Sequence, residues 1–120
     1  MEWVKLSVLD FGDMAKAINS LSVFFPAYNE EAHIKNTVLA AKKVLEKIAD
    51  RWEITVVDDG SKDGTGKAAD GLAKEDFRIK VIHHSQNRGY GAAFKSGFYS
   101  AKYPWIAFTD SDGQFDFSEI

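Results

Sequence analysis

A chain of 120 residues has the length of a single domain, and its hydrophobic content of 45% is enough to build a core, which excludes a disordered chain. The net charge of −3 argues against a general nucleic-acid binder, whose phosphate contacts need a basic face. Cysteine is absent, which excludes disulfides and thiolate chemistry. We find no membrane-spanning apolar run and no secretory signal, and we therefore expect a cytoplasmic chain without a transmembrane segment.

Strand-like and helix-like segments alternate along the chain. Residues 1–19 predict a short helix or an extended arm, and residues 20–120 predict the main domain. Within it we expect strands at 21–25, 52–57, 77–82 and 104–110, with helices at about 29–49, 64–74 and 92–101. This order predicts an α/β fold with three layers, in which a mainly parallel sheet lies between helices. The third strand alternates apolar and polar residues, which favours an edge position.

The helix predicted for residues 29–49 carries one continuous apolar stripe. Asn29 is its expected N-cap, and Glu30 and Glu31 would fall in the first turn, where the helix dipole favours acids. We expect Pro26 to end the preceding strand, because proline lacks the N–H that a ladder needs. The stripe consists of Ile34, Val38, Ala41, Leu45 and Ile48.

Each predicted strand is followed by a polar cluster. The carboxyl ends of parallel strands meet at one edge of a sheet, where ligands bind. This placement favours a ligand site at that edge over the alternative that the clusters are unrelated polar turns. The clusters are Pro26–Glu30, Asp58–Ser61, Asn87–Gly89 and Asp110–Asp112.

The last cluster has the composition of a metal site. Asp110 and Asp112 lie two residues apart and can converge on one point, where a hard divalent cation would relieve their repulsion. Taken alone, such a pair is more often an acidic surface turn. The three preceding clusters shift the balance towards a metal site.

Three other motif readings fit less well. Residues from Asp59 to Asp70 approach the spacing of a calcium-binding loop, but they follow a strand and lack the final glutamate. A phosphate-loop reading of Gly60–Lys67 has one residue too many and is followed by Ala68 where a hydroxyl is required. Gly89–Phe94 is a broken dinucleotide fingerprint, although its turn into a helix could face a diphosphate. The histidines show no ligand spacing, and we expect them to be surface or strand-end residues.

Together, four segments resemble the family 2 glycosyltransferases of the GT-A fold, and most of all their polyprenyl-phosphate sugar transferases of the dolichol-phosphate mannose synthase type. The resemblance covers residues 20–120. It implies the Rossmann-like, nucleotide-binding half of a GT-A fold, with the four strands in the order 3-2-1-4. The segments are Phe25–Glu31, Val56–Thr65, Asn87–Gly91 and Asp110–Gln114.

The resemblance also implies roles for individual residues. Asp110, Asp112 and Gln114 would hold Mg²⁺ or Mn²⁺, and Asp112 is the expected catalytic residue. Independently of the resemblance, the position of Tyr28 at a strand exit beside acids suits either stacking on a base or packing in the core. The nucleotide-sugar donor would be bound by Pro26, Tyr28, Glu30, Val57, Asp58, Asp59, Arg88, Gly89, Asp110 and Ser111.

The implied reaction is a metal-dependent, inverting transfer of sugar from a UDP- or GDP-linked donor to an acceptor, here a polyprenyl phosphate at the cytoplasmic face of a membrane. The family's catalytic domain continues beyond the Asp110–Gln114 motif, so we expect the donor-binding half of an enzyme, inactive by itself. A non-catalytic nucleotide-sugar-binding module is the alternative. A nucleotidyltransferase fits less well, because no glycine-rich basic loop follows the first strand.

Overall fold

A parallel five-stranded sheet forms the centre of the protein. The computed structural model describes residues 2–5 and 19–108, with side chains from residue 19 onwards. Every neighbouring pair of strands is parallel, and the order across the sheet is β1-β5-β2-β3-β4. The strands are β1 (Glu2–Lys5), β2 (Ser20–Ala27), β3 (Arg51–Asp58), β4 (Ile79–His83) and β5 (Trp105–Phe108).

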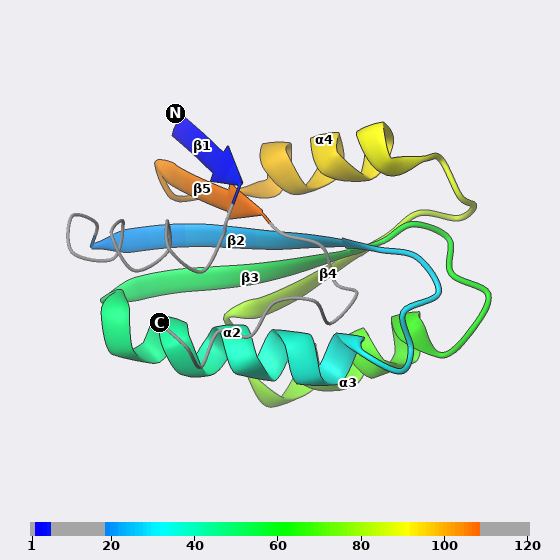
Figure 1. The fold of residues 1–120 in the computed structure, drawn as a ribbon, viewed down its shortest axis with the longest axis horizontal. Coiled ribbons are helices and arrows are strands. Elements are labelled where there is room, and N and C mark those ends of the chain that lie inside the picture. Colours follow the sequence, from blue (N-terminus) through cyan, green and yellow to red (C-terminus); the bar gives the residue numbers. More distant parts are fainter. Residues whose placement is uncertain (1, 6–18, 109–120) are drawn as a thin grey trace.

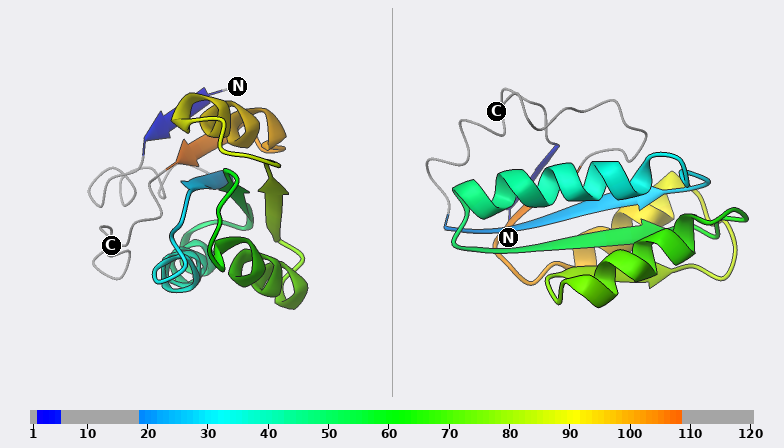
Figure 2. Two further views of the ribbon diagram at one scale, coloured as in Figure 1. Left: turned by 90° about the vertical axis from the view of Figure 1, so that its right-hand side faces the viewer. Right: turned by 90° about the horizontal axis from the view of Figure 1, so that it is seen from below.

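Helices cover both faces of this sheet. Helices α2 (Ile34–Ile48) and α3 (Thr65–Glu75) pack on one face, and α4 (Tyr90–Ser100) packs on the other (Figure 1; Figure 2, left). Alternation along β2 supplies both cores: Val23 and Phe25 belong to the cluster under α2 and α3, whereas Phe24 belongs to the cluster under α4. The three-layer α/β/α fold predicted from the sequence is confirmed.

The predicted strand order is confirmed as well. Numbered along the chain as in the sequence prediction, β2 to β5 lie in the order 3-2-1-4, with β4 at the edge. The structure adds β1, which pairs in parallel with β5 from Glu2↔Trp105 to Lys5↔Phe108. The sequence had left a short helix and an extended arm open for this region; Glu2–Lys5 is extended, and residues 6–18 lie outside the described part.

Several predicted boundaries were wrong by two residues or more; the third strand, predicted from residue 77, begins at Ile79. Strand β2 continues through Pro26 to Ala27, which pairs with Asp58; only one residue follows the proline, so its missing donor costs little of the ladder. Helix α2 begins at Ile34, five residues later than predicted, and His33 occupies the N-cap position without a side-chain cap. Asn29 is not the N-cap, because it has a positive φ of 52° and bonds to a neighbouring loop.

A buried carboxylate ties the amino-terminal side of the sheet together. Glu53 of β3 is 2% exposed and accepts hydrogen bonds from Ser22 Oγ (2.6 Å) and the Lys102 N–H (2.8 Å). Lys80 Nζ of β4 lies 2.7 Å from Glu53 Oε1. Burial by itself would raise the pKa of Glu53, but the contacts with Lys80, Ser22 and the Lys102 N–H outweigh burial and hold the pKa below its ordinary value. The cluster therefore links β2, β3, β4 and the segment before β5.

Helix α4 approaches β2 closely at a glycine. A Cβ added to Gly97 would lie 2.2 Å from Cδ2 of Phe24, whose ring also stacks on Phe108 and meets Phe94 edge-on. The ring is 1% exposed and enclosed by its neighbours, so it has little room to move. Gly97 therefore sets the distance between α4 and the sheet.

Alanine substitution of two helix glycines should have opposite effects. Gly97→Ala should lower the free energy of unfolding by about 1–3 kcal/mol, because the added methyl overpacks Phe24. Gly71→Ala on α3 is the matched control, since no atom lies within 4 Å of its added Cβ. It should raise stability by up to about 1 kcal/mol through helix propensity. Urea unfolding of both variants measures this, and equal effects would contradict the close approach of α4.

Acid should remove the stabilisation that Glu53 contributes. Its pKa is lower in the folded state than in the unfolded chain, so its contribution is complete above the unfolded value and is lost as pH falls through the folded value. Glu53→Gln should lower the free energy of unfolding at pH 7 by about 1–2 kcal/mol and reduce its fall between pH 7 and acid pH. Urea titrations at several pH values test this, with exposed Glu75→Gln as the control that follows the wild-type curve.

Candidate functional site

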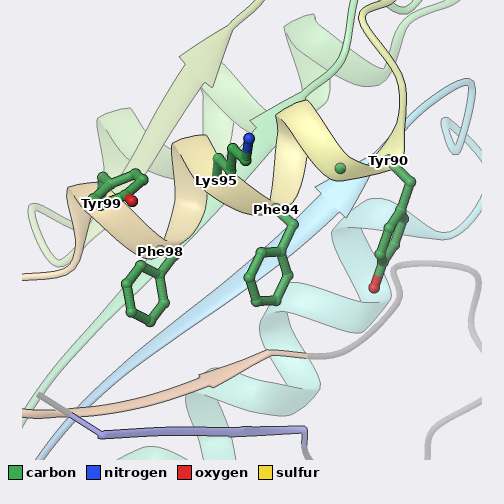
Figure 3. A pocket seen from close by; sticks show the side chains of 6 residues that line it. Tyr90, Phe94, Lys95, Phe98 and Tyr99 are labelled. Carbon is green, nitrogen blue, oxygen red and sulfur yellow. The ribbon is translucent and has the colours of Figure 1, made fainter.

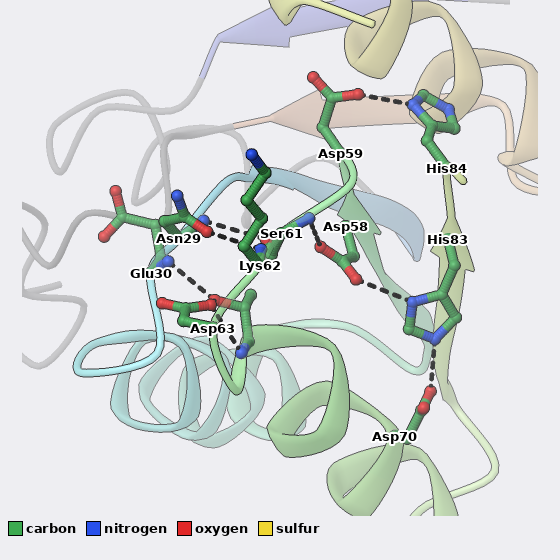
Figure 4. Close-up of polar contacts among 11 residues, drawn as sticks. Asn29, Glu30, Asp58, Asp59, Ser61, Lys62, Asp63, Asp70, His83 and His84 are labelled. Atoms are coloured by element: carbon green, nitrogen blue, oxygen red, sulfur yellow. Dashed lines mark hydrogen bonds and ion pairs between the residues drawn. The ribbon is translucent and has the colours of Figure 1, made fainter. Parts of the chain in front are cut away.

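Three loops leave the carboxyl ends of β2, β3 and β4 and gather at one edge of the sheet (Figure 1). They comprise residues 28–33, 59–64 and 84–89. Binding sites of parallel α/β sheets lie at such an edge. The side chains of these loops and of the adjoining strand ends therefore form the candidate site (Figure 4).

The first two loops are linked by side-chain to backbone hydrogen bonds. The Asn29 N–H donates to Ser61 Oγ (3.0 Å), and the Lys62 N–H donates to Asn29 Oδ1 (2.9 Å; Figure 4). The Glu30 N–H donates to Thr65 Oγ1 (2.8 Å), at the start of α3. Asn29 has a positive φ, which asparagine adopts more readily than most residues, and its side chain is held by the second loop. These bonds hold the 28–33 loop against the 59–64 loop.

Asp58, at the end of β3, contacts a histidine of the edge strand. Its side chain is 8% exposed, with Oδ2 lying 2.9 Å from His83 Nδ1 and Oδ1 accepting the Ser61 N–H (3.0 Å). His83 Nε2 lies 2.8 Å from Asp70 on α3, so the ring bridges two acids (Figure 4). The carboxylates of Asp70 and Asp58 together raise the pKa of His83 above its ordinary value. A charged His83 would therefore strengthen the link between β3, β4 and α3.

Asp59 organises the third loop. Its Oδ1 lies 2.8 Å from His84 Nδ1 and accepts the Arg88 N–H (2.9 Å), while its Oδ2 accepts the Gly89 N–H (3.0 Å). On the other side of the ring, His84 Nε2 lies 2.8 Å from Ser96 Oγ of α4. Burial by itself would raise the pKa of Asp59, but the bonds from His84, Arg88 and Gly89 outweigh it and leave the pKa below its ordinary value.

The turn after Asp59 requires glycine. Gly60 has a φ of +71°, and a Cβ at this position would lie 2.3 Å from the carbonyl carbon of Gln86. The obstacle is backbone, which a side-chain rearrangement cannot relieve. The 59–64 and 84–89 loops therefore touch main chain to main chain.

The structure brings several predicted donor residues to this edge. Asp58, Asp59, Arg88 and Gly89 lie together, and Tyr28 and Glu30 lie on the adjoining loop; Tyr28 is 41% exposed. Pro26 and Val57 are buried in strands β2 and β3. The predicted donor and metal residues Asp110, Ser111, Asp112 and Gln114 lie outside the described residues. Within residues 19–108, no group of three or more potential ligands is placed to hold a metal ion.

The calcium-loop reading is also decided by these contacts. Asp59 bonds to His84, Asp63 accepts the Thr65 N–H, and Asp70 bonds to His83. The three acids thus have separate partners and do not converge. This arrangement does not favour a calcium loop.

The sequence analysis missed the roles of His83 and His84. Their arrangement has a readable signal: two adjacent histidines end an edge strand, and two adjacent aspartates end its neighbour. The register places Asp58 directly opposite His83. Adjacent acids and adjacent histidines at the ends of neighbouring strands could therefore have indicated ion pairs between the strands.

An apolar cavity of about 380 Å³ lies on α4, beside the same edge (Figure 3). Tyr90, Phe94 and Phe98 project from one side of the helix, at a spacing of four residues, and Lys95 is also among the lining residues. Tyr90 directly follows Gly89, so the cavity starts where the third loop ends. Among the described residues, none of the predicted donor residues lines it.

These observations define an α/β protein whose ligand edge is built from acids and main-chain amides at the ends of parallel strands. The family model "Glycosyl transferase family 2" matches residues 22–120, and the chain belongs to this family. Its sheet corresponds to the N-terminal, Rossmann-like half of the GT-A fold. The family predicted from the four sequence motifs is thus confirmed.

Individual relatives agree with this assignment. A dolichyl-phosphate beta-glucosyltransferase of Saccharomyces cerevisiae is 40% identical over 106 residues, which cover 83% of this chain and 32% of that protein. A dolichol-phosphate mannosyltransferase of the same yeast is 34% identical over 94 residues, covering 78% of this chain and 35% of that protein. The chain therefore spans about a third of the length of these relatives.

A solved structure shows the same fold. Glucosyl-3-phosphoglycerate synthase from Mycobacterium tuberculosis, in complex with Mn²⁺, UDP and glucosyl-3-phosphoglycerate, matches with a TM-score of 0.64 and 26% identity. The match covers 88% of this chain and 38% of that one.

In the described part of the present chain, no helix is long and apolar enough to cross a membrane.

Removing the Thr65 hydroxyl should loosen the first two loops. Thr65→Val keeps the branched shape but removes the acceptor of the Glu30 N–H, and we expect a loss of roughly 1–3 kcal/mol in the free energy of unfolding. Amide exchange at Glu30 should accelerate. Thr65→Ser is the matched control, because it keeps the hydroxyl and should keep the slow exchange. Equal Glu30 exchange in both variants would contradict the assigned link.

Proposed function

We propose that this chain is the donor-binding part of a metal-dependent, inverting glycosyltransferase. It would act on a UDP- or GDP-linked sugar and transfer the sugar to a polyprenyl phosphate. The observation that carries the proposal is the carboxyl edge of the sheet, where Asp58, Asp59, Arg88 and Gly89 are held together in a chain of family 2. The names of the yeast relatives support a lipid-phosphate acceptor.

The donor would lie across the three loops. Pro26, Tyr28 and Glu30 would lie along the nucleoside, and Val57, Asp58 and Asp59 would border the base and ribose. Tyr28 is suited to stacking, because its ring is 41% exposed at the loop surface. Arg88 is exposed at the end of the third loop, where its guanidinium can meet an anionic diphosphate.

The remaining donor contacts would come from the segment that follows β5. Asp110, Asp112 and Gln114 offer two carboxylates and an amide oxygen, which is the ligand chemistry that Mg²⁺ and Mn²⁺ prefer. The matching mycobacterial synthase was solved with Mn²⁺. In this role the cation supplies charge neutralisation for the departing nucleoside diphosphate, and Ser111 would add a donor contact between its ligands.

The acceptor chemistry fits the same proposal. A lipid phosphate carries its own negative charge, so its oxygen can attack the anomeric carbon without a strong general base. Attack from the side opposite the diphosphate inverts that carbon. Asp112 is the proposed catalytic residue, because it would hold the cation whose positive charge compensates the negative charge of the leaving group.

A non-catalytic nucleotide-sugar-binding module is the second candidate for these 120 residues. The observation that favours it is the coverage of relatives, of which the chain spans 32% and 35%. Transfer of labelled sugar to a polyprenyl phosphate by the chain itself would exclude this second candidate.

Nucleotide binding should depend on the cation and on Asp112. Calorimetry with UDP and GDP, with and without Mn²⁺, should show tighter binding of one nucleotide when Mn²⁺ is present. Asp112→Ala should remove that enhancement, at a cost of about ten-fold in affinity or more, equivalent to 1.4 kcal/mol. Asp116→Ala, an acidic neighbour without an assigned role, is the matched control and should bind as wild type does. Binding that is independent of Mn²⁺ and unchanged in Asp112→Ala would refute the metal role.

A further inference from the structure

His84 is the first residue of the third loop, and its side chain connects this loop to α4. Its side chain is 6% exposed, and both ring nitrogens have partners. Nδ1 lies 2.8 Å from Asp59 (Figure 4), and Nε2 lies 2.8 Å from Ser96. The apolar clusters of the core do not include this residue. A buried side chain that lies outside the core and has partners at both nitrogens indicates a role in holding the surrounding loop.

The direction of its hydrogen bonds follows from the acid. The Asp59 carboxylate already accepts two backbone N–H groups and can only accept from the ring, so Nδ1 of His84 must carry a proton and donate it. Nε2 then pairs with the Ser96 hydroxyl, which can either donate or accept. The Nδ1 bond therefore persists whether the ring is neutral or charged.

The order Ser96, His84, Asp59 is also that of a serine hydrolase triad, but the surroundings do not suit catalysis. The carboxylate that would orient the ring also holds the Arg88 and Gly89 amides, and the ring is almost inaccessible. The cavity on α4 is not lined by Ser96. These contacts indicate that the hydrogen-bond network of Ser96, His84 and Asp59 holds the backbone of the third loop in place.

The segment that this network fixes is the entry to α4. Gly89 has a φ of +96° and occupies the N-cap position of the helix without a side-chain cap. The Arg88 and Gly89 amides both donate hydrogen bonds to Asp59, so the orientation of this one carboxylate sets the position of the loop. His84 sets that orientation, because it is attached to Asp59 at one end and to α4 at the other.

We propose that His84 is a positioning residue for the nucleotide-sugar donor: through Asp59 it holds Arg88 and Gly89 where they meet the diphosphate. This inference rests on the proposed function, which assigns the donor to those two residues. Loss of the Nδ1 donor leaves Asp59 bonded only to the two loop amides, without its attachment to His84. The loop is then held less firmly, and a loop that must be ordered on binding binds its ligand less tightly. The effect falls on donor affinity and leaves the core intact.

Two substitutions of His84 separate the donor bond from the rest of the side chain. In His84→Asn the amide nitrogen is the same number of bonds from Cα as Nδ1, so it can still donate to Asp59. His84→Ala removes the donor. We expect His84→Ala to raise the dissociation constant for UDP or GDP, whichever binds with Mn²⁺, by about ten-fold, and His84→Asn to stay within about three-fold of wild type.

Backbone amide exchange supplies a readout that needs no ligand. In His84→Ala the Arg88 and Gly89 amides should exchange faster, whereas in His84→Asn they should stay protected. Glu53→Gln is the control for general destabilisation, because it weakens the opposite end of the sheet and should leave nucleotide affinity unchanged.

The outcomes are distinct. Wild-type affinity in His84→Ala, or unchanged exchange at Arg88 and Gly89, would overturn the positioning role while leaving the proposed function in place. Equal losses in His84→Asn and His84→Ala would show that the Nδ1 donor is not the cause, and would also overturn it. If the wild-type chain binds neither nucleotide, the proposed function fails and the donor role of His84 fails with it, even where exchange shows that the loop is held.

Discussion

Every buried acid on β3 or directly after it meets a basic side chain from β4 or directly after it. Glu53 meets Lys80, Asp58 meets His83, and Asp59 meets His84. A carboxylate that leaves water without a partner is strongly destabilising, so each of these acids requires its base. The pairing constrains the register of the two strands, and it explains why the edge position belongs to β4. An edge strand can keep Lys80 and His83 partly in solvent, at 42% and 43% exposure, while their nitrogen atoms reach the buried acids.

The same acids then organise what lies beyond the strands. Glu53 holds the segment that enters β5, through the Lys102 N–H, and Asp59 holds the segment that enters α4, through Arg88 and Gly89. One strand thus positions connections at both ends of the sheet. At the carboxyl edge this produces loops that are bonded to each other before any ligand arrives. A site built this way loses little conformational freedom on binding, which favours affinity without additional contacts.

The fold could be read from the sequence because its signals are repetitive. Apolar runs, helical stripes and polar strand ends recur along the chain, and each repeat supports the same three-layer arrangement. The errors lie where tertiary contacts override a local preference. Asn29 has the composition of an N-cap, yet it bonds across to Ser61 and Lys62, and no local pattern contains that partner. The same limit applies to His83 and His84. Their spacing along the chain indicates no site, whereas their partners Asp58 and Asp59 come from the end of the neighbouring strand.

Counting lone pairs narrows how the two aspartates can meet a ligand. A carboxylate offers about four acceptor positions, two on each oxygen. Oδ1 of Asp59 is already used twice, by His84 and by the Arg88 N–H, and Oδ2 is used once, by the Gly89 N–H. One acceptor position on Oδ2 is left over in this count. Asp58 keeps one position on each oxygen, since His83 and the Ser61 N–H take one apiece. Asp59 is therefore used mainly in fixing the loop, and under the proposed function Asp58 would have the larger capacity for direct contact with a nucleotide-sugar donor.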